Sequence, residues 1–159
     1  MKVVSDTSPL HYLILIGEVR IVPALFGRLM VPAEVIRELA HPRSPDPVRE
    51  WAGSPPSWID VINGTTALSD PKLGPGESAA IAVALERSTD LLLIDERCGT
   101  KVARDLGIES VGTVGVLAAA AERDLLSLRE SYAALRATSF RGPEELMDEI
   151  VRINEQRRG

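Results

Sequence analysis

The sequence contains a single cysteine, Cys98, which excludes an internal disulfide and is typical of a reducing compartment. Aromatic residues are scarce, with two each of Trp, Tyr and Phe, so the core has to be built from aliphatic side chains. No apolar run approaches the roughly 20 residues that a membrane span needs, and the N-terminal stretch reaches Asp6 without the apolar segment of a signal peptide. We therefore expect a cytoplasmic protein without a membrane partner.

The sequence also lacks an excess of basic residues. It has 18 Lys and Arg against 23 Asp and Glu, which gives a net charge of −5. The charge of the whole chain therefore does not indicate nucleic-acid binding, and an RNA substrate would have to be held by a local group of basic residues. With 45% hydrophobic and 26% charged residues, the composition is that of a folded globular protein and not of a disordered one.

Short apolar segments alternate with helical patterns along the chain. Strands are predicted at 2–5, within 28–32, and at 57–62, 91–94 and 110–113, with helices at 9–17, 18–26, 32–39, 77–87, 98–106, 114–123, 128–137 and 143–156. This alternation predicts an α/β fold, a three-layer sandwich whose central, mostly parallel sheet is flanked by helices. We expect a single domain over 1–159, with a core at about 2–125 and C-terminal helices at 128–156 that pack on it.

Two segments have a less regular pattern. Residues 41–57 carry five prolines and are expected to form an exposed excursion with one helical turn around Trp51. In the last helix, Leu146, Ile150 and Ile153 share one apolar face. That face packs on the domain or forms a dimer contact, and the pattern allows both.

Four acidic residues are predicted to approach one another. Asp6 follows the first strand and Asp95 follows the strand at 91–94, so both lie at the same sheet edge if the two strands are neighbours. Glu77 lies in the first turn of a helix, on its apolar face, where a carboxylate is costly to bury without compensation. Glu38 flanks the apolar face of its own helix. The two helices can each place one acid in a common cleft.

Each acid alone also has an ordinary interpretation. Asp6 fits a turn or cap, Glu77 fits a partner of the helix dipole, and Glu38 and Glu96 fit solvated or capping acids. These interpretations do not suffice if the acids lie close together, because unit charges ~4 Å apart repel by roughly 4 kcal/mol near a protein surface. Such a cluster needs protons or cations, and an all-oxygen set favours Mg²⁺ or Mn²⁺. A metal site of this kind can activate a water molecule for attack on a phosphodiester bond.

Three basic residues follow the last of these acids. Arg97, Lys101 and Arg104 recur at i, i+4 and i+7, so they share one face of a helix that starts beside Asp95. A phosphate backbone can lie across such a face, which makes these residues candidates for substrate binding. The alternative is a solvated helix face.

Five sequence blocks occur in the order found in a known family. They are "SDTSPL", "VPAEVIREL", "LGPGESAAIAVALE", "LLLIDERCGTKVARDLGI" and "VGTVGVLAAA". These blocks resemble PIN-domain nucleases, and in particular the bacterial and archaeal PIN-like proteins similar to VapC-type toxins. The resemblance covers roughly residues 2–125.

The resemblance implies a Mg²⁺- or Mn²⁺-dependent endoribonuclease. By motif, its catalytic and metal-binding acids would be Asp6, Glu38, Glu77 and Asp95. Ser8 matches a hydroxyl position common in the family, two residues after the first acid. The sequence departs from the family pattern at Ile94, where many members have threonine. This leaves two roles open for Glu96, that of an auxiliary metal-binding residue and that of a cap on the next helix.

The same resemblance implies partners: an RNA substrate, an antitoxin protein and a second copy of the chain in a homodimer. A catalytically silent PIN-like module that binds RNA, a protein or a metal is the alternative function. A phosphatase with an aspartate nucleophile is disfavoured, because Ser8 occupies the position where such enzymes carry a second acid.

Overall fold

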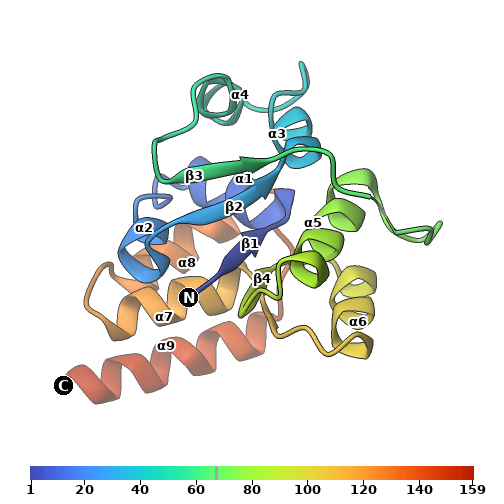
Figure 1. Cartoon of the computed structure of the whole chain (residues 1–159). Helices are drawn as coiled ribbons and strands as arrows, with labels where there is room; N and C mark the ends of the chain where they lie inside the picture. The colour runs from blue at the N-terminus through green and yellow to red at the C-terminus, as the bar shows by residue number, and fades with distance from the viewer. Residues whose placement is uncertain (67) are drawn as a thin grey trace.

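The computed structural model describes residues 1–66 and 68–159. Within them, five strands form one sheet: β1 (Val3–Ser5), β2 (Leu29–Pro32), β3 (Ile59–Ile62), β4 (Leu91–Leu93) and β5 (Ser110–Val111). The strand order is β3-β2-β1-β4-β5, and all neighbouring pairs run parallel. The sheet is flanked by helices (Figure 1), which confirms the predicted α/β sandwich.

The helices connect the strands and then close the chain. They are α1 (Thr7–Leu15), α2 (Ile21–Phe26), α3 (Ala33–Leu39), α4 (Asp46–Gly53), α5 (Pro75–Glu86), α6 (Arg97–Asp105), α7 (Thr113–Glu122), α8 (Leu128–Arg136) and α9 (Glu144–Arg158). The second helix begins at Ile21 and not at residue 18 as the pattern suggested. In the described part of the chain, no helix combines the length and the apolar composition needed to cross a bilayer.

The two faces of the sheet support separate hydrophobic cores. Val3 and Leu93 face a core shared with α1, α7, α8 and α9, whereas Val4 and Leu92 face one shared with α5 and α6. This division follows from the strand geometry, because successive side chains of a strand point to opposite faces. Figure 1 shows the corresponding layers, with α7 and α9 on one side of the sheet and α5 and α6 on the other.

The segment 41–57 is more regular than its prolines suggested. It contains α4, whose eight residues bury Val48 and Ala52, so the expectation of a single helical turn is wrong. Pro47 lies in the first turn of α4, where the absence of an N–H is tolerated. Trp51 and Trp58 pack against each other with ring centroids 6.2 Å apart.

The last helix packs through a face adjacent to the apolar stripe seen in the sequence. Met147 and Val151 are buried against the core, whereas Leu146 and Ile153 are 53% and 44% exposed. Two apolar stripes lie side by side on α9, and periodicity alone cannot decide which of them packs. Leu146 and Ile153 are therefore left exposed, whereas Ile150 of the same stripe is half-buried and packs against the core.

The strand order creates a crevice at the carboxyl end of β1. The chain continues from β1 to β2 on one side, while β4 pairs with β1 on the other, so the winding direction reverses between β1 and β4. The backbone N–H of Asp6 donates to the carbonyl of Leu93 at 2.9 Å and extends this pairing to the sheet edge. In open α/β sheets such a reversal point is where ligands bind.

Candidate functional site

A cavity of about 290 Å³ opens at the carboxyl ends of β1 and β4. Residues that line it include Asp6, Thr7, His11, Glu38, Glu77 and Glu96. Three of the predicted acids, Asp6, Glu38 and Glu77, are therefore brought together at one site. Asp95 does not border this cavity, and its neighbour Glu96 does.

Asp6 is the most deeply placed acid of the cavity. It directly follows β1, and the residue is only 2% exposed. Burial raises the pKa of Asp6 to about 7, and the charges of Glu77, Glu38 and Asp95 add to the rise, although the backbone N–H of Thr7 opposes it. Among the described residues, no group donates a hydrogen bond to its buried Oδ1. One oxygen of Asp6 is thus buried without a compensating hydrogen bond.

Glu38 has both carboxylate oxygens engaged. The Thr7 hydroxyl donates to its Oε1 at 2.5 Å, and the backbone N–H of Gly76 donates to its Oε2 at 2.9 Å. Gly76 lies in the first turn of α5, where N–H groups lack partners within the helix. A Cβ on Gly76 would collide with the Glu38 carboxylate, so this close approach requires glycine. The contact joins α3 to the N-terminus of α5.

Glu77 differs from Glu38 in having one oxygen without a donor. Its Oε1 accepts from the backbone N–H of Gly74 at 3.2 Å, while its Oε2 is buried and receives no hydrogen bond within the described residues. Burial raises the pKa of Glu77, the Gly74 N–H lowers it, and the charges of Glu96 and Glu38 raise it further. A Cβ on Gly99 would lie 2.7 Å from Oε2, so the start of α6 fits closely against this carboxylate.

Asp95 does not border this cavity, although its charge raises the pKa of Asp6, and its carboxylate is bonded to the start of α7. Its Oδ1 accepts from the backbone N–H of Thr113 at 2.7 Å, and its Oδ2 accepts from the Thr113 hydroxyl at 2.7 Å and from the Ser8 hydroxyl at 3.0 Å. Glu96 occupies the N-cap position of α6, but within the described residues its side chain makes no capping hydrogen bond. Both adjacent acids influence the cluster, because the charge of Glu96 raises the pKa of Glu77 and the charge of Asp95 raises the pKa of Asp6. The predicted ligand role of Asp95 stays a prediction.

The carboxylates suit a hard divalent cation. Their donors are all oxygens, and two of these, on Asp6 and Glu77, are buried without a hydrogen bond. Across the described ranges, no three His, Cys, Asp or Glu side chains form a preformed metal cage. Mg²⁺ rarely needs one, since it commonly binds through one or two carboxylates and keeps several waters. The residues therefore fit a cation held by Asp6 and Glu77 with water in its remaining positions.

The three predicted substrate-binding cations lie on an exposed face of α6. Lys101 pairs with Asp105, with 2.9 Å between Nζ and Oδ2. Arg97 borders a second cavity beside the acidic one, whereas Lys101 and Arg104 border neither of the two. Contact between these three residues and RNA stays a prediction.

Several residues of the site had no assigned role in the sequence interpretation. Thr7 and Thr113 are hydroxyl residues at the first position of a helix, a pattern that can indicate bonding to a nearby acid. Burial lowers the pKa of His11, so its imidazole is neutral at pH 7 on the cavity wall. The inward position of Glu96 had no signal apart from its adjacency to Asp95.

The raised pKa of Asp6 predicts a pH-dependent effect on stability. The ordinary pKa of Asp is about 3.9, so between pH 4 and 7 the folded chain holds a proton that the unfolded chain has lost. Stability therefore falls as pH rises through this window. In chelator at pH 8, Asp6→Asn should raise the free energy of unfolding by about 2–4 kcal/mol, with little difference at pH 4. Urea unfolding at both pH values measures this, and equal stabilities at pH 8 would contradict it.

Comparison with known proteins identifies the family of the chain. A family model described as a PIN domain matches residues 2–156, which includes every strand of the sheet and most of α9. None of the curated proteins searched matches the sequence. Because the match extends over nearly the whole chain, it establishes family membership. The chain belongs to the PIN-domain family.

Proposed function

We propose that the protein is a divalent-metal-dependent endoribonuclease that hydrolyses RNA phosphodiester bonds with Mg²⁺ or Mn²⁺. Membership of the PIN-domain family indicates a nuclease-type function. The choice of RNA rests on the motif resemblance, and the choice of metal rests on the all-oxygen character of the cavity.

The observation that carries this proposal is the burial of Asp6. A carboxylate that is 2% exposed and surrounded by acids is costly unless something neutralises it. In the described part of the chain, no Lys or Arg forms an ion pair with it. A divalent cation would neutralise Asp6 and Glu77 at once and would use the oxygens that accept no hydrogen bond.

The residues of the cavity divide the chemistry between them. A bound divalent cation would supply Lewis-acid activation of the phosphodiester and lower the pKa of a bound water. Asp6 and Glu77, each with one oxygen that accepts no hydrogen bond within the described residues, would hold the cation. Glu38, with both oxygens engaged, would act through water. Glu96, exposed at the cavity wall, would accept the proton of the attacking water.

Asp95 is better suited to positioning than to ligation in this scheme. Three donated hydrogen bonds from Thr113 and Ser8 occupy its carboxylate and fix the turn between β4 and α6. That turn sets the direction of Glu96. We therefore assign Glu96 a direct role and Asp95 an indirect one, which reverses the priority that the sequence suggested.

Cleavage of a mixed RNA pool tests the function. With Mn²⁺ or Mg²⁺ the native chain should cut RNA, and chelator should stop it. Asp6→Asn should lower the rate at least 100-fold, because it removes the charge of a direct ligand. Product sizes on a denaturing gel, followed over time, give the rates.

Glu145→Gln is the matched control, since it removes one exposed acid in the first turn of α9, away from the cavity. Its rate should equal that of the native chain. Metal-dependent stabilisation without any cleavage would favour the catalytically silent module. A metal at ~100 times its Kd should add about 2.7 kcal/mol to the free energy of unfolding. The absence of both cleavage and stabilisation would contradict the metal site.

Two isosteric substitutions separate the roles of the adjacent acids. Asp95→Asn keeps an acceptor for the Thr113 N–H, and the Thr113 and Ser8 hydroxyls can reorient to accept from the amide. It should therefore keep a tenth or more of the native cleavage rate. Glu96→Gln should lose 100-fold or more, because an amide cannot take the proton. The reverse order of rates would return the ligand role to Asp95.

The narrower assignment is the toxin of a toxin–antitoxin pair, bound by an antitoxin and present as a homodimer. It rests on the resemblance of the motifs to VapC-like proteins. The exposed stripe of α9 with Leu146 and Ile153 is compatible with a contact to another chain.

Expression in a bacterial host tests the toxin assignment. Induction of the native chain should arrest growth within a few generations, and Asp6→Asn should not, because arrest requires cleavage. Colony counts after induction measure the effect. Normal growth with the native chain, at protein levels equal to those of the variant, would contradict the toxin role and leave the nuclease proposal intact.

A further inference from the structure

A second cavity of about 690 Å³ adjoins the acidic one. Ser8, Tyr12 and Glu96 border both cavities, so the two are continuous. The second cavity lies between α1, the start of α6 and the loop that joins α8 to α9. Its volume lies within the range of small-molecule sites and can receive a nucleotide unit.

Two arginines that border this cavity form no ion pair within the described residues. Arg97 is the first residue of α6, and Arg141 lies in the loop between α8 and α9. Both are exposed, and within the described residues neither has a carboxylate in ion-pair range. Lys101, by contrast, is paired with Asp105, and Arg104, which forms no ion pair within the described residues, borders neither cavity. Arg97 and Arg141 are therefore the unpaired cations that lie beside the acidic cavity.

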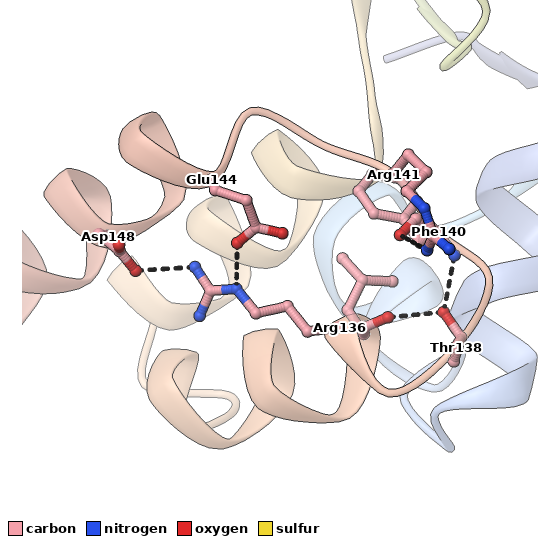
Figure 2. A network of polar contacts seen from close by, with 7 residues as sticks. Arg136, Thr138, Phe140, Arg141, Glu144 and Asp148 are labelled. Atoms are coloured by element: carbon pink, nitrogen blue, oxygen red, sulfur yellow. Dashed lines mark hydrogen bonds and ion pairs between the residues drawn. The ribbon is translucent and has the colours of Figure 1, made fainter.

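The α8–α9 loop is held in place by its own polar contacts (Figure 2). Arg136 of α8 donates to Glu144 at 2.6 Å and to Asp148 at 2.8 Å, and so ties the start of α9 to α8. The Thr138 hydroxyl accepts from the backbone N–H of Phe140 at 3.1 Å. These contacts limit the conformations of the loop, so that the wall it forms is present before a ligand arrives.

Arg141 is oriented by the same loop. Its guanidinium donates to the carbonyls of Ser139 at 3.2 Å and Phe140 at 3.1 Å through a single nitrogen, Nη1. A guanidinium has five N–H donors, so others stay available for phosphate oxygens.

Aromatic rings form the apolar part of the wall. Tyr12 and Phe140 pack edge to face, with ring centroids 5.1 Å apart and planes at 84°. The Tyr12 hydroxyl is 3.0 Å from the Ser139 hydroxyl, which links α1 to the loop. Bases of single-stranded nucleic acids stack on such rings beside cationic groups.

Two acids in the same lining do not make the cavity repulsive to phosphate. The carboxylate of Asp95 is covered by donors from Thr113 and Ser8. Glu96 faces the acidic cavity as well, where a bound cation would offset its charge. The charges of Arg97 and Arg141 therefore favour the binding of a phosphate in the second cavity.

We infer that the second cavity is a nucleotide-binding subsite for single-stranded RNA. Arg97 and Arg141 bind the phosphates next to the cleaved one, and the wall of Tyr12 and Phe140 contacts a base. The inference rests on the proposed nuclease function and deepens it, because it places the strand across the α8–α9 loop and not along the Lys101 and Arg104 face of α6.

RNA binding by arginine variants tests this subsite. All variants carry Asp6→Asn so that the RNA is not cut, and binding of a labelled single-stranded RNA is followed by fluorescence anisotropy at several salt concentrations. Arg97→Ala and Arg141→Ala should each raise Kd about 5–10-fold and lower the slope of log Kd against log salt by about 0.7. Arg141→Lys should keep the slope, since it keeps the charge.

Arg87→Ala is the matched control. Arg87 is exposed at the C-cap of α5, and its carbonyl accepts from Lys2 just before β1, at the opposite edge of the sheet from the cavity. It should change neither Kd nor slope. If both arginine variants bind RNA as tightly as the Asp6→Asn parent, and the native chain cleaves RNA in a metal-dependent way, the subsite is overturned and the nuclease proposal stands. Equal losses in all three alanine variants would overturn it as well. An absence of both RNA binding and cleavage in the native chain would overturn both proposals.

Discussion

The acidic cavity depends on the helix N-termini that converge at the carboxyl edge of the sheet. Asp6 immediately precedes α1 and Glu96 immediately precedes α6, while Glu38 accepts from an N–H in the first turn of α5 and Asp95 from one at the start of α7. Each N-terminus carries roughly half a positive charge and N–H groups without intrahelical partners. A doubly wound parallel sheet brings these ends together, so the architecture itself offsets part of the repulsion between acids.

The hydrogen bonds that compensate the buried carboxylates are unequally distributed, and this divides the acids into two pairs. Both oxygens of Glu38 and of Asp95 accept hydrogen bonds, so these two side chains connect secondary-structure elements in a fixed arrangement. Asp6 and Glu77 each keep one buried oxygen without a donor, and burial raises the pKa of both. A buried polar atom without a partner costs free energy that a ligand can recover. The uncompensated pair therefore marks where a cation would gain most by binding.

Much of the fold was accessible from the sequence, because the signals were local. Apolar runs before Asp6 and Asp95 predicted two buried strands, which pair in the structure, and helical periodicity allowed Glu38 and Glu77 to reach a common cleft, which both residues line. The parts that the sequence left open, or suggested wrongly, depend on choices between similar local solutions. The α9 helix carries two apolar stripes, and prolines in 41–57 were compatible both with a loop and with the first turn of a helix.

The surroundings of Asp95 and Glu96 could not be predicted from the local sequence for a physical reason. Both residues follow the last residue of β4, Leu93, so the alternation of side chains along a strand does not determine their directions. Asp95 is bonded by donors distant in sequence, namely Thr113, 18 residues away from Asp95, and Ser8, 87 residues away. Those donors hold Asp95 against α7, whereas Glu96 is exposed and borders the acidic cavity. In this chain the adjacent acid pair thus combines an anchored carboxylate with an exposed one, and Thr113, at the start of the helix after the next strand, supplies two of the three anchoring hydrogen bonds.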